Sequence, residues 1–318
     1  GASNGGDALA AAITTYEALE DRMGRIASYA GLLFATSSTV PEHARFYGDM
    51  QTALTELNSE LLFFGLELNG LDDTEIEQLA ASSSAFARYL PWVNDLRLHR
   101  EHDLSTESEQ LMQDKSLTGR SAWTRLFDET MARMRFDFEG STVSLEQVLD
   151  KLSDPDRALR QKAVEALTAR FQANQPLFTH VTNTLSKDLE LDGKWRGYED
   201  VAGARHIANR VEAPVTQSVQ EAYPRLSHRY YALKAKWLGL DQLETWDRNA
   251  PLPEEKTDLI PWDRAKDIVL SAYADFAPDL AAQAAPFFDR GWINAAPREG
   301  KAGGAFLIRR CPLRTLLF

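Results

Sequence analysis

The side chains best suited to metal or acid–base chemistry in this sequence are its six histidines, and they are widely spaced. A catalytic zinc ion needs about three protein ligands and one open coordination position. Only His99 and His102 lie within one helical turn of each other, beside Glu101 and Asp103. This ligand set is incomplete, so we interpret the group as a solvated, polar helix end. The sequence therefore predicts no metal site and no catalytic residue.

A second group of polar residues lies between Lys194 and Asn209. Its members could line a cleft and meet peptide carbonyls or a carboxylate, which a guanidinium binds well. The candidate substrate-binding residues are Arg196, Tyr198, Arg205, His206 and Asn209. In the structural alternative, Arg196 and Arg205 pair with Asp192, Glu199 or Asp200 and fix a joint between a helix and a loop. We favour this alternative, because ion-pair networks are common outside functional sites.

Other functional motifs find no support. Gly1 to Gly5 fits the G-x-S-x-G pattern of a nucleophile elbow, but that turn connects a strand to a helix, and we expect residues 1–6 to form a flexible leader. The sequence contains no G-x-G-x-x-G and no Walker loop, so nucleotide binding is not indicated. The net charge of −12 argues against nucleic-acid binding, which needs clustered Lys and Arg.

Composition and cysteine usage favour a cytoplasmic protein. The single Cys311 cannot form an internal disulfide. No apolar run approaches the roughly 20 residues that a membrane-spanning helix needs. We therefore expect neither a membrane nor a nucleic acid among its partners.

The hydrophobic pattern predicts an all-α fold. Apolar residues recur every three or four positions from Leu9 to about Ala35, and again from Tyr47 to Leu68, so two long helices are expected to pack as an antiparallel hairpin. Further helices are expected at 176–191, from about 213, and at 261–285. The start signals are Asp72 with Glu75, Thr106 with Glu109, Ser144 with Gln147, and Asp154 with Pro155.

One segment, residues 135–144, has strand character. Phe136 and Phe138 alternate with charged residues, Glu139 and Gly140 supply a turn, and Val143 lies on the returning arm. The predicted fold is therefore a multi-helix lobe with one small β-hairpin.

The stretch from Tyr223 to Pro253 combines a helix with an unusual loop. An aromatic-rich face, which we expect to be buried in a core rather than to bind substrate, comprises Tyr223, Leu226, Tyr230, Tyr231, Leu233 and Trp237. The polar segment from Trp246 to Pro251 reads as a specified loop.

The run HRYYALKAKWLGLDQLETWDRNAPLP, from His228 to Pro253, closely resembles the oligoendopeptidase F branch of the M3 zinc metallopeptidases. Residues 152–167 (LSDPDRALRQKAVEAL) and 184–211 (TLSKDLELDGKWRGYEDVAGARHIANRV) resemble the same family in the same order. The resemblance extends from about Asp7 to Ala305 and covers the family's N-terminal lobe. It implies an N-terminal helical region at 7–150 and the start of the peptidase body at 151–306.

The family's catalytic signature, H-E-x-x-H, supplies two zinc ligands and a general base, and this sequence does not contain it. The resemblance implies zinc as the cofactor of the intact enzyme, and none in this chain. Residues 307–318 follow the family-like run Gly300 to Phe306 but resemble nothing in the family. Our hypothesis is that a frameshift replaced the catalytic half by this tail.

By resemblance, the intact enzyme hydrolyses short peptides within a channel that this lobe walls. The chain alone is expected to be inactive and, with apolar surface exposed, to self-associate or to pair with a missing C-terminal half. The alternative is a standalone helical scaffold, derived from the lobe, that binds peptides or proteins.

Overall fold

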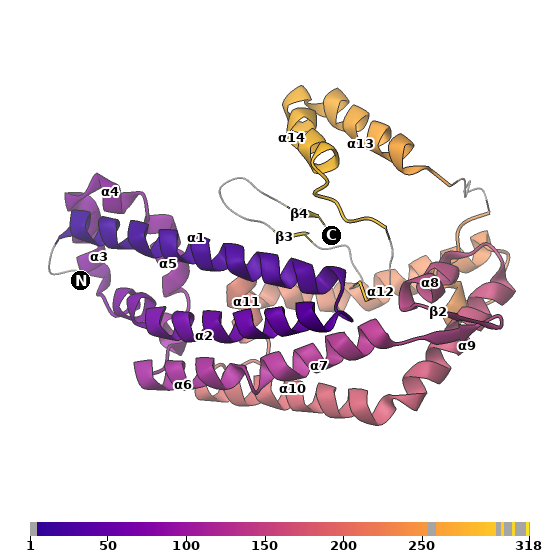
Figure 1. The fold of residues 1–318 in the computed structure, drawn as a ribbon, viewed down its shortest axis with the longest axis horizontal. Coiled ribbons are helices and arrows are strands. Elements are labelled where there is room, and N and C mark those ends of the chain that lie inside the picture. The colour runs from indigo at the N-terminus through magenta and orange to yellow at the C-terminus, as the bar shows by residue number, and fades with distance from the viewer. Residues whose placement is uncertain (1–4, 254–258, 297–299, 302–306, 309–315, 318) are drawn as a thin grey trace. The chain divides into compact units, whose positions relative to one another are not determined.

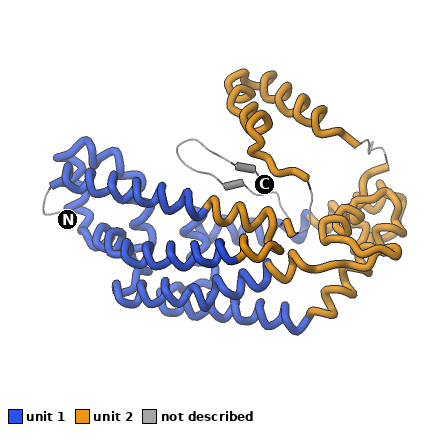
Figure 2. The backbone as a smooth tube through the Cα atoms, viewed as in Figure 1, with its two compact units in different colours: residues 1–27, 45–128, 175–226 blue, residues 28–44, 129–174, 227–318 orange. Residues whose placement is uncertain are grey.

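The computed structural model describes residues 5–253, 259–296, 300–301, 307–308 and 316–317 (Figure 1). It folds into two compact units that interleave along the chain (Figure 2). Unit 1 comprises Gly1–Ala27, Arg45–Asp128 and Gln175–Leu226; unit 2 comprises Ser28–Ala44, Glu129–Asn174 and Ser227–Phe318. The family boundary expected at residue 150 stays a prediction.

Two long helices open the fold, as the hydrophobic spacing predicts. They are α1 (Gly6–Thr36) and α2 (Pro41–Asn69), and they run side by side in opposite directions (Figure 1). In unit 1 the ring of Tyr16 stacks on that of Phe64, with centroids 4.9 Å apart. Short helices follow: α3 (Asp73–Ser82), α4 (Ser84–Ala87), α5 (Leu90–Arg97), the 3₁₀ turn η2 (Arg100–His102) and α6 (Thr106–Ser116).

The core of unit 1 lies where α1 and α2 meet these short helices. Its buried members are Leu9, Ala10, Ile13, Leu68, Ile76, Phe86 and Val93. The capping box of Asp72 and Glu75 at the start of α3 is confirmed. The helix expected to continue through Ala87 instead breaks at Ser83, whose hydroxyl accepts a hydrogen bond from Phe86 N at 3.1 Å and caps α4.

The expected hairpin is present in unit 2. Strands β1 (Phe136–Phe138) and β2 (Ser141–Val143) pair antiparallel, with Phe136 opposite Val143. Glu139 and Gly140 have φ angles of 49° and 79°, as the two central residues of a tight hairpin turn require. Phe136 is fully buried. A second antiparallel pair, β3 (Leu307–Ile308) with β4 (Leu316–Leu317), was not predicted; most of the run 300–306 and of the tail 307–318 lies outside the described residues.

The remaining elements are α7 (Arg120–Arg133), α8 (Leu145–Asp150), the 3₁₀ turn η3 (Lys151–Ser153), α9 (Arg157–Ala173), α10 (Gln175–Trp195), α11 (Gly203–Asn209), α12 (Ala213–Trp237), the 3₁₀ turn η4 (Thr245–Asp247), α13 (Trp262–Phe276) and α14 (Pro278–Asp289). Three details of these helices differ from expectation. The N-cap of α6 is Ser105 and not Thr106, and the N-cap of α9 is Asp156 and not Asp154. The single helix expected at 261–285 is divided at Pro278, the first residue of α14. In both helices a nearby residue, Ser105 or Asp156, has a side-chain oxygen that accepts a hydrogen bond from the backbone N–H of the first turn.

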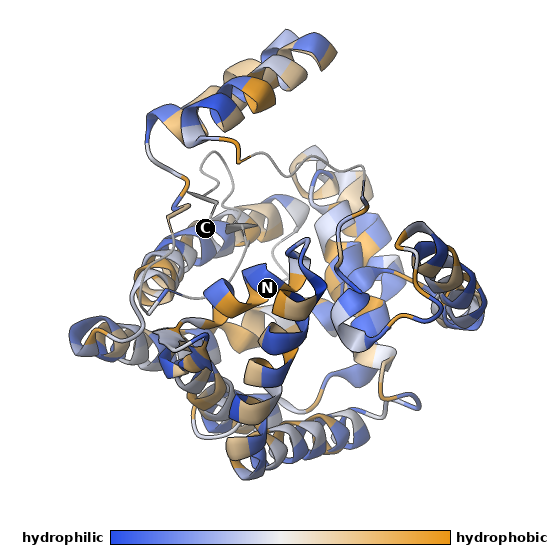
Figure 3. Ribbon diagram, turned by 90° about the vertical axis from the view of Figure 1, so that its right-hand side faces the viewer, coloured by the Kyte–Doolittle hydropathy of each residue, from blue (hydrophilic) through white to orange (hydrophobic). Residues whose placement is uncertain are grey.

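The prediction that the aromatic face of α12 is buried is wrong for the described residues. The side chains of Tyr223, Leu226, Tyr230, Leu233 and Trp237 are 43–63% exposed. Polar and apolar residues share the helices throughout (Figure 3). The spacing placed these residues on one face correctly, but spacing alone cannot say whether a partner covers that face.

Candidate functional site

In unit 1, Arg196 is the centre of a network of hydrogen bonds. It follows the last turn of α10, and its guanidinium donates to both carboxylate oxygens of Glu109 at 2.6 and 2.9 Å. Its Nε donates to Asp192 at 3.0 Å, and Nη1 donates to the backbone carbonyl of His102 at 3.3 Å. One side chain thus joins α6, α10 and η2.

The partner Asp192 was foreseen as part of the structural alternative, whereas Glu109 was not. Glu109 is 87 positions away from Arg196 and was interpreted as a capping partner of Thr106. In fact its Oε1 also accepts a hydrogen bond from the backbone N–H of Leu104 at 3.0 Å. No local sequence signal marks Glu109 as buried; the structure shows that it is only 9% exposed.

The charges of this pair stabilise each other. Burial alone would raise the pKa of Glu109, but the hydrogen bonds from Arg196 and from Leu104 N outweigh it, so this pKa lies below its usual value. The hydrogen bond with Glu109 raises the pKa of Arg196. Both groups therefore carry their full charge over the whole physiological pH range.

His102 and Tyr198 stack beside this network, with ring centroids 3.8 Å apart and an angle of 27° between the planes. Nδ1 of His102 lies 2.9 Å from the backbone carbonyl oxygen of Arg196. A carbonyl can only accept, so Nδ1 carries the hydrogen of this contact. Burial raises the pKa of Tyr198, which keeps its hydroxyl protonated.

A cavity of about 450 Å³ lies against the network. Its apolar wall includes Leu61, Leu62, Leu66 and Leu96, and its polar wall includes Asn69, His99, His102, Asp103, Glu109, Arg196 and Tyr198. Of the five predicted substrate-binding residues, Arg196 and Tyr198 line it. The other three lie on α11: Arg205 and Asn209 are exposed, and Nε2 of His206 is 3.8 Å from Asp200.

In unit 2, Asp247 is the centre of a second network. Its fully buried carboxylate accepts hydrogen bonds from Arg157 at 2.8–3.2 Å, from Arg160 at 2.9 Å and from the backbone N–H of Glu244 at 3.0 Å. The hydrogen bonds from Arg157 hold the pKa of Asp247 far below its usual value, although burial opposes this.

Arg160 extends the Asp247 network into the backbone, and Lys234 binds the same loop separately. Arg160 is 4% exposed and donates to the carbonyls of Asp154, Pro155 and Trp246 at 2.8–3.0 Å. Lys234, on α12, donates to the carbonyl of Arg248 at 2.7 Å. The expectation of a specified loop at Trp246–Pro251 thus has a physical basis: buried charges fix its backbone.

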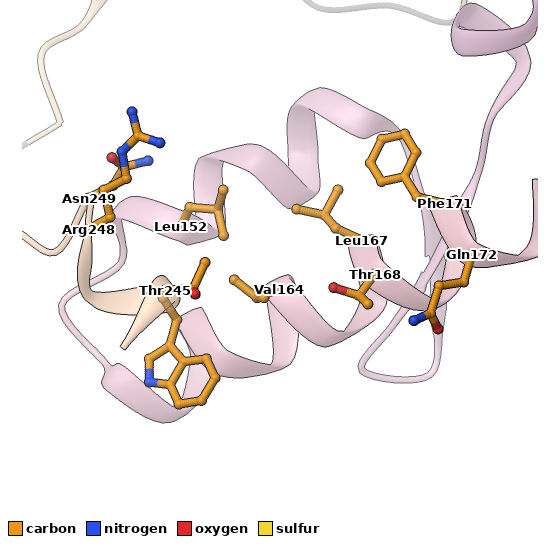
Figure 4. Close-up of a pocket in the computed structure, with 10 residues that line it drawn as sticks. Leu152, Val164, Leu167, Thr168, Phe171, Gln172, Thr245, Arg248 and Asn249 are labelled. Carbon is orange, nitrogen blue, oxygen red and sulfur yellow. The ribbon is translucent and has the colours of Figure 1, made fainter. Parts of the chain in front are cut away.

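A second cavity, of about 430 Å³, lies beside this loop (Figure 4). Leu152, Val164, Leu167 and Phe171 form its apolar side, and Thr245, Trp246 and Arg248 lie at its border. Across the described part of the chain, no three His, Cys, Asp or Glu side chains are grouped as metal ligands. No helix in that part is long and apolar enough to cross a membrane.

Comparison with known proteins agrees with this fold. Residues 67–136 match the family model for the N-terminal region of M3 peptidases, described as oligopeptidase F. Oligopeptidase PepF of Bacillus subtilis is 22% identical over 94% of this chain and 46% of its own length. Group B oligopeptidase PepB of Streptococcus agalactiae is 22% identical over 91% of this chain and 49% of its own length.

The crystal structure of oligoendopeptidase-F from Enterococcus faecium superimposes with a TM-score of 0.70, at 18% identity, over 94% of this chain and 64% of that one. The family resemblance expected from the sequence is confirmed: the chain is similar to the N-terminal region of oligoendopeptidase F-like M3 peptidases. It spans about half the length of the curated relatives it matches.

Proposed function

We propose that this chain is the N-terminal lobe of a zinc-dependent peptidase that in its full-length form hydrolyses short peptides. The observation that carries this proposal is the similarity to oligopeptidase PepF, which extends over 94% of this chain but 46% of the relative. The substrate-binding role of Arg196, Tyr198, Arg205, His206 and Asn209 stays a prediction, and we propose the cytoplasm as the location of the protein.

By the same reasoning, the chain alone hydrolyses no peptide, because its sequence contains no H-E-x-x-H motif to hold zinc and activate water. The test is a quenched-fluorescence peptide assay on the purified chain with added zinc, beside a full-length relative as positive control. Hydrolysis by the chain at a rate comparable to that relative would refute the assignment.

The exposed face of α12 supports a second part of the proposal, self-association. Within unit 2, the apolar side of this helix presents Tyr230, Leu233 and Trp237, which are 43–52% exposed, and grouped exposed apolar residues mark an interaction surface. We propose that two chains pair through it, or that a C-terminal half covers it.

Light scattering tests this proposal. Tyr230→Glu places a charge on this face and should convert a dimer into a monomer, whereas Gln220→Glu, at an exposed position of the same helix, should not. A strict monomer of the parent chain at all concentrations rejects pairing.

The alternative role, a standalone peptide- or protein-binding scaffold, is favoured by this same exposed face and predicts a bound partner without any hydrolysis. Sequencing the gene past codon 306 tests the frameshift.

A further inference from the structure

The cavity in unit 2 has an apolar floor and a single charged residue at its border. Leu152, Val164, Leu167 and Phe171 form the floor, and Arg248 is the only charged side chain among the described residues that line it. The volume is about 430 Å³. Small-ligand sites are typically cavities of this size, mostly apolar, with a few polar groups that orient the ligand. The wall therefore has the composition of a small-ligand site.

Arg248 differs from the two arginines of the neighbouring network. Arg157 and Arg160 both pair with Asp247. Arg248 is exposed, and its guanidinium makes no hydrogen bond or ion pair within the described part of the chain. The backbone of the residue is nevertheless held in place, because its carbonyl accepts a hydrogen bond from Nζ of Lys234 at 2.7 Å. The fold thus fixes the position of Arg248 and leaves its positive charge available.

The positive charge lies at one end of the apolar floor. Figure 4 shows Arg248 and Asn249 at one end of the row of lining side chains, and Phe171 and Gln172 at the other. A guanidinium binds a carboxylate through two parallel hydrogen bonds. No Asp or Glu is among the described residues that line the cavity, so an anion meets no repelling charge at its wall. This arrangement fits a ligand with a carboxylate at one end and an apolar chain behind it.

We propose that this cavity binds a monocarboxylic acid with an apolar tail, such as a medium-chain fatty acid. The carboxylate pairs with Arg248, and the tail covers Leu152, Val164 and Leu167, which removes apolar surface from water. A peptide would instead lay backbone N–H and C=O groups on this floor, where their burial without partners is costly. The inference goes beyond the proposed function, because it involves neither hydrolysis nor a zinc-binding half, and its failure would leave the peptidase assignment unchanged.

Calorimetric titration of the full chain tests the ligand class with four probes. Octanoate carries the carboxylate and the tail; octan-1-ol and octylammonium carry the same tail without the negative charge, and N-acetyl-leucyl-leucine carries the carboxylate on a peptide. Octanoate should bind, and the other three should bind at least about tenfold more weakly, because each loses either the charged hydrogen bond or the apolar fit. The proposal is overturned if octanoate does not bind at millimolar concentration, if the alcohol or the amine binds equally well, or if the peptide does, which would assign the cavity to peptides.

Two variants locate the site. Arg248→Gln removes the charge and keeps a polar side chain, and Thr168→Trp, at an exposed position of the cavity wall, fills the space that the tail would occupy. Each should weaken octanoate binding about tenfold, whereas Arg170→Gln, at an exposed position of α9 outside the wall, should bind normally. Circular dichroism establishes that each variant is folded, and Arg248→Gln alone decides the question if Thr168→Trp unfolds. Normal octanoate binding by a folded Arg248→Gln, or an equal loss in Arg170→Gln, refutes this site.

Discussion

Both units contain an arginine–carboxylate network, and the two differ in how completely the carboxylate is enclosed. In unit 2, Asp247 is fully buried, and two arginines and a backbone N–H surround it. In unit 1, Glu109 is 9% exposed, and its partner Arg196 borders a cavity of about 450 Å³. The first network is enclosed by its own chain, whereas the second lies at the wall of a cavity.

This difference separates a structural network from a candidate binding site. The Asp247 network connects two segments that lie 90 positions apart. Each guanidinium nitrogen of Arg160 already donates to a backbone carbonyl or to the carboxylate of Asp247. Breaking a saturated buried pair leaves an uncompensated charge. The two networks should therefore respond differently to the same change from a carboxylate to an amide.

The largest effect is expected for Asp247→Asn. It leaves Arg160, 4% exposed, without its counter-charge, and breaking a buried pair in this way costs about 3–5 kcal/mol of unfolding free energy. Urea unfolding at pH 7, followed by circular dichroism, measures the loss. Asp241→Asn, at an exposed position near the same loop, is the matched control. A loss below about 1 kcal/mol would mean that the arginines find water or other partners and that this network is not essential to unit 2.

The pH dependence of the unfolding free energy tests whether Asp247 stabilises unit 2 through its negative charge. The folded-state pKa of Asp247 is lowered by its hydrogen bonds with Arg157, whereas the unfolded chain has a value of about 3.9. The stability contribution is therefore fully present well above pH 4 and is lost as pH falls toward the folded pKa. The difference in unfolding free energy between the parent chain and Asp247→Asn should be constant from pH 7 to 5 and shrink below about pH 4. A difference that stays constant down to pH 3 would contradict the ionic origin.

A smaller effect is expected for Glu109→Gln. The amide can still accept one hydrogen bond from Arg196, and Asp192 remains as a counter-charge at 3.0 Å. Losing a hydrogen bond to a charged group costs about 1–3 kcal/mol. Urea unfolding measures it against Glu107→Gln, an exposed residue in the first turn of the same helix. A loss as large as that of Asp247→Asn would show that the two networks are equally closed.

The sequence predicted the elements far better than the networks. Local spacing determines where α1 and α2 lie, and local turn chemistry determines the hairpin at Gly140, because both depend on residues only a few positions apart. The exposed face of α12 was mistaken for core. Periodicity reports which side chains share a face, but whether another segment covers that face is a tertiary property.

The candidate site could be predicted only in part. Arg196 and Tyr198 were identified from their residue types, and Asp192 from its position one helical turn before Arg196. Glu109, Asn69 and Asp103 could not be assigned, because the fold brings them together from distant segments.

The smallest effect is expected for Glu139→Gln, which completes the series at an exposed pair. Lys162 donates to Glu139 at 2.8 Å, but the two side chains are 57% and 48% exposed, so water replaces the contact at little cost. Gln keeps the side-chain length and leaves the hairpin turn unchanged. The urea midpoint of unfolding should equal that of the parent chain within error. A shift as large as that of Glu109→Gln would mean that hydrogen-bond number, and not burial, determines the ranking of the three carboxylates.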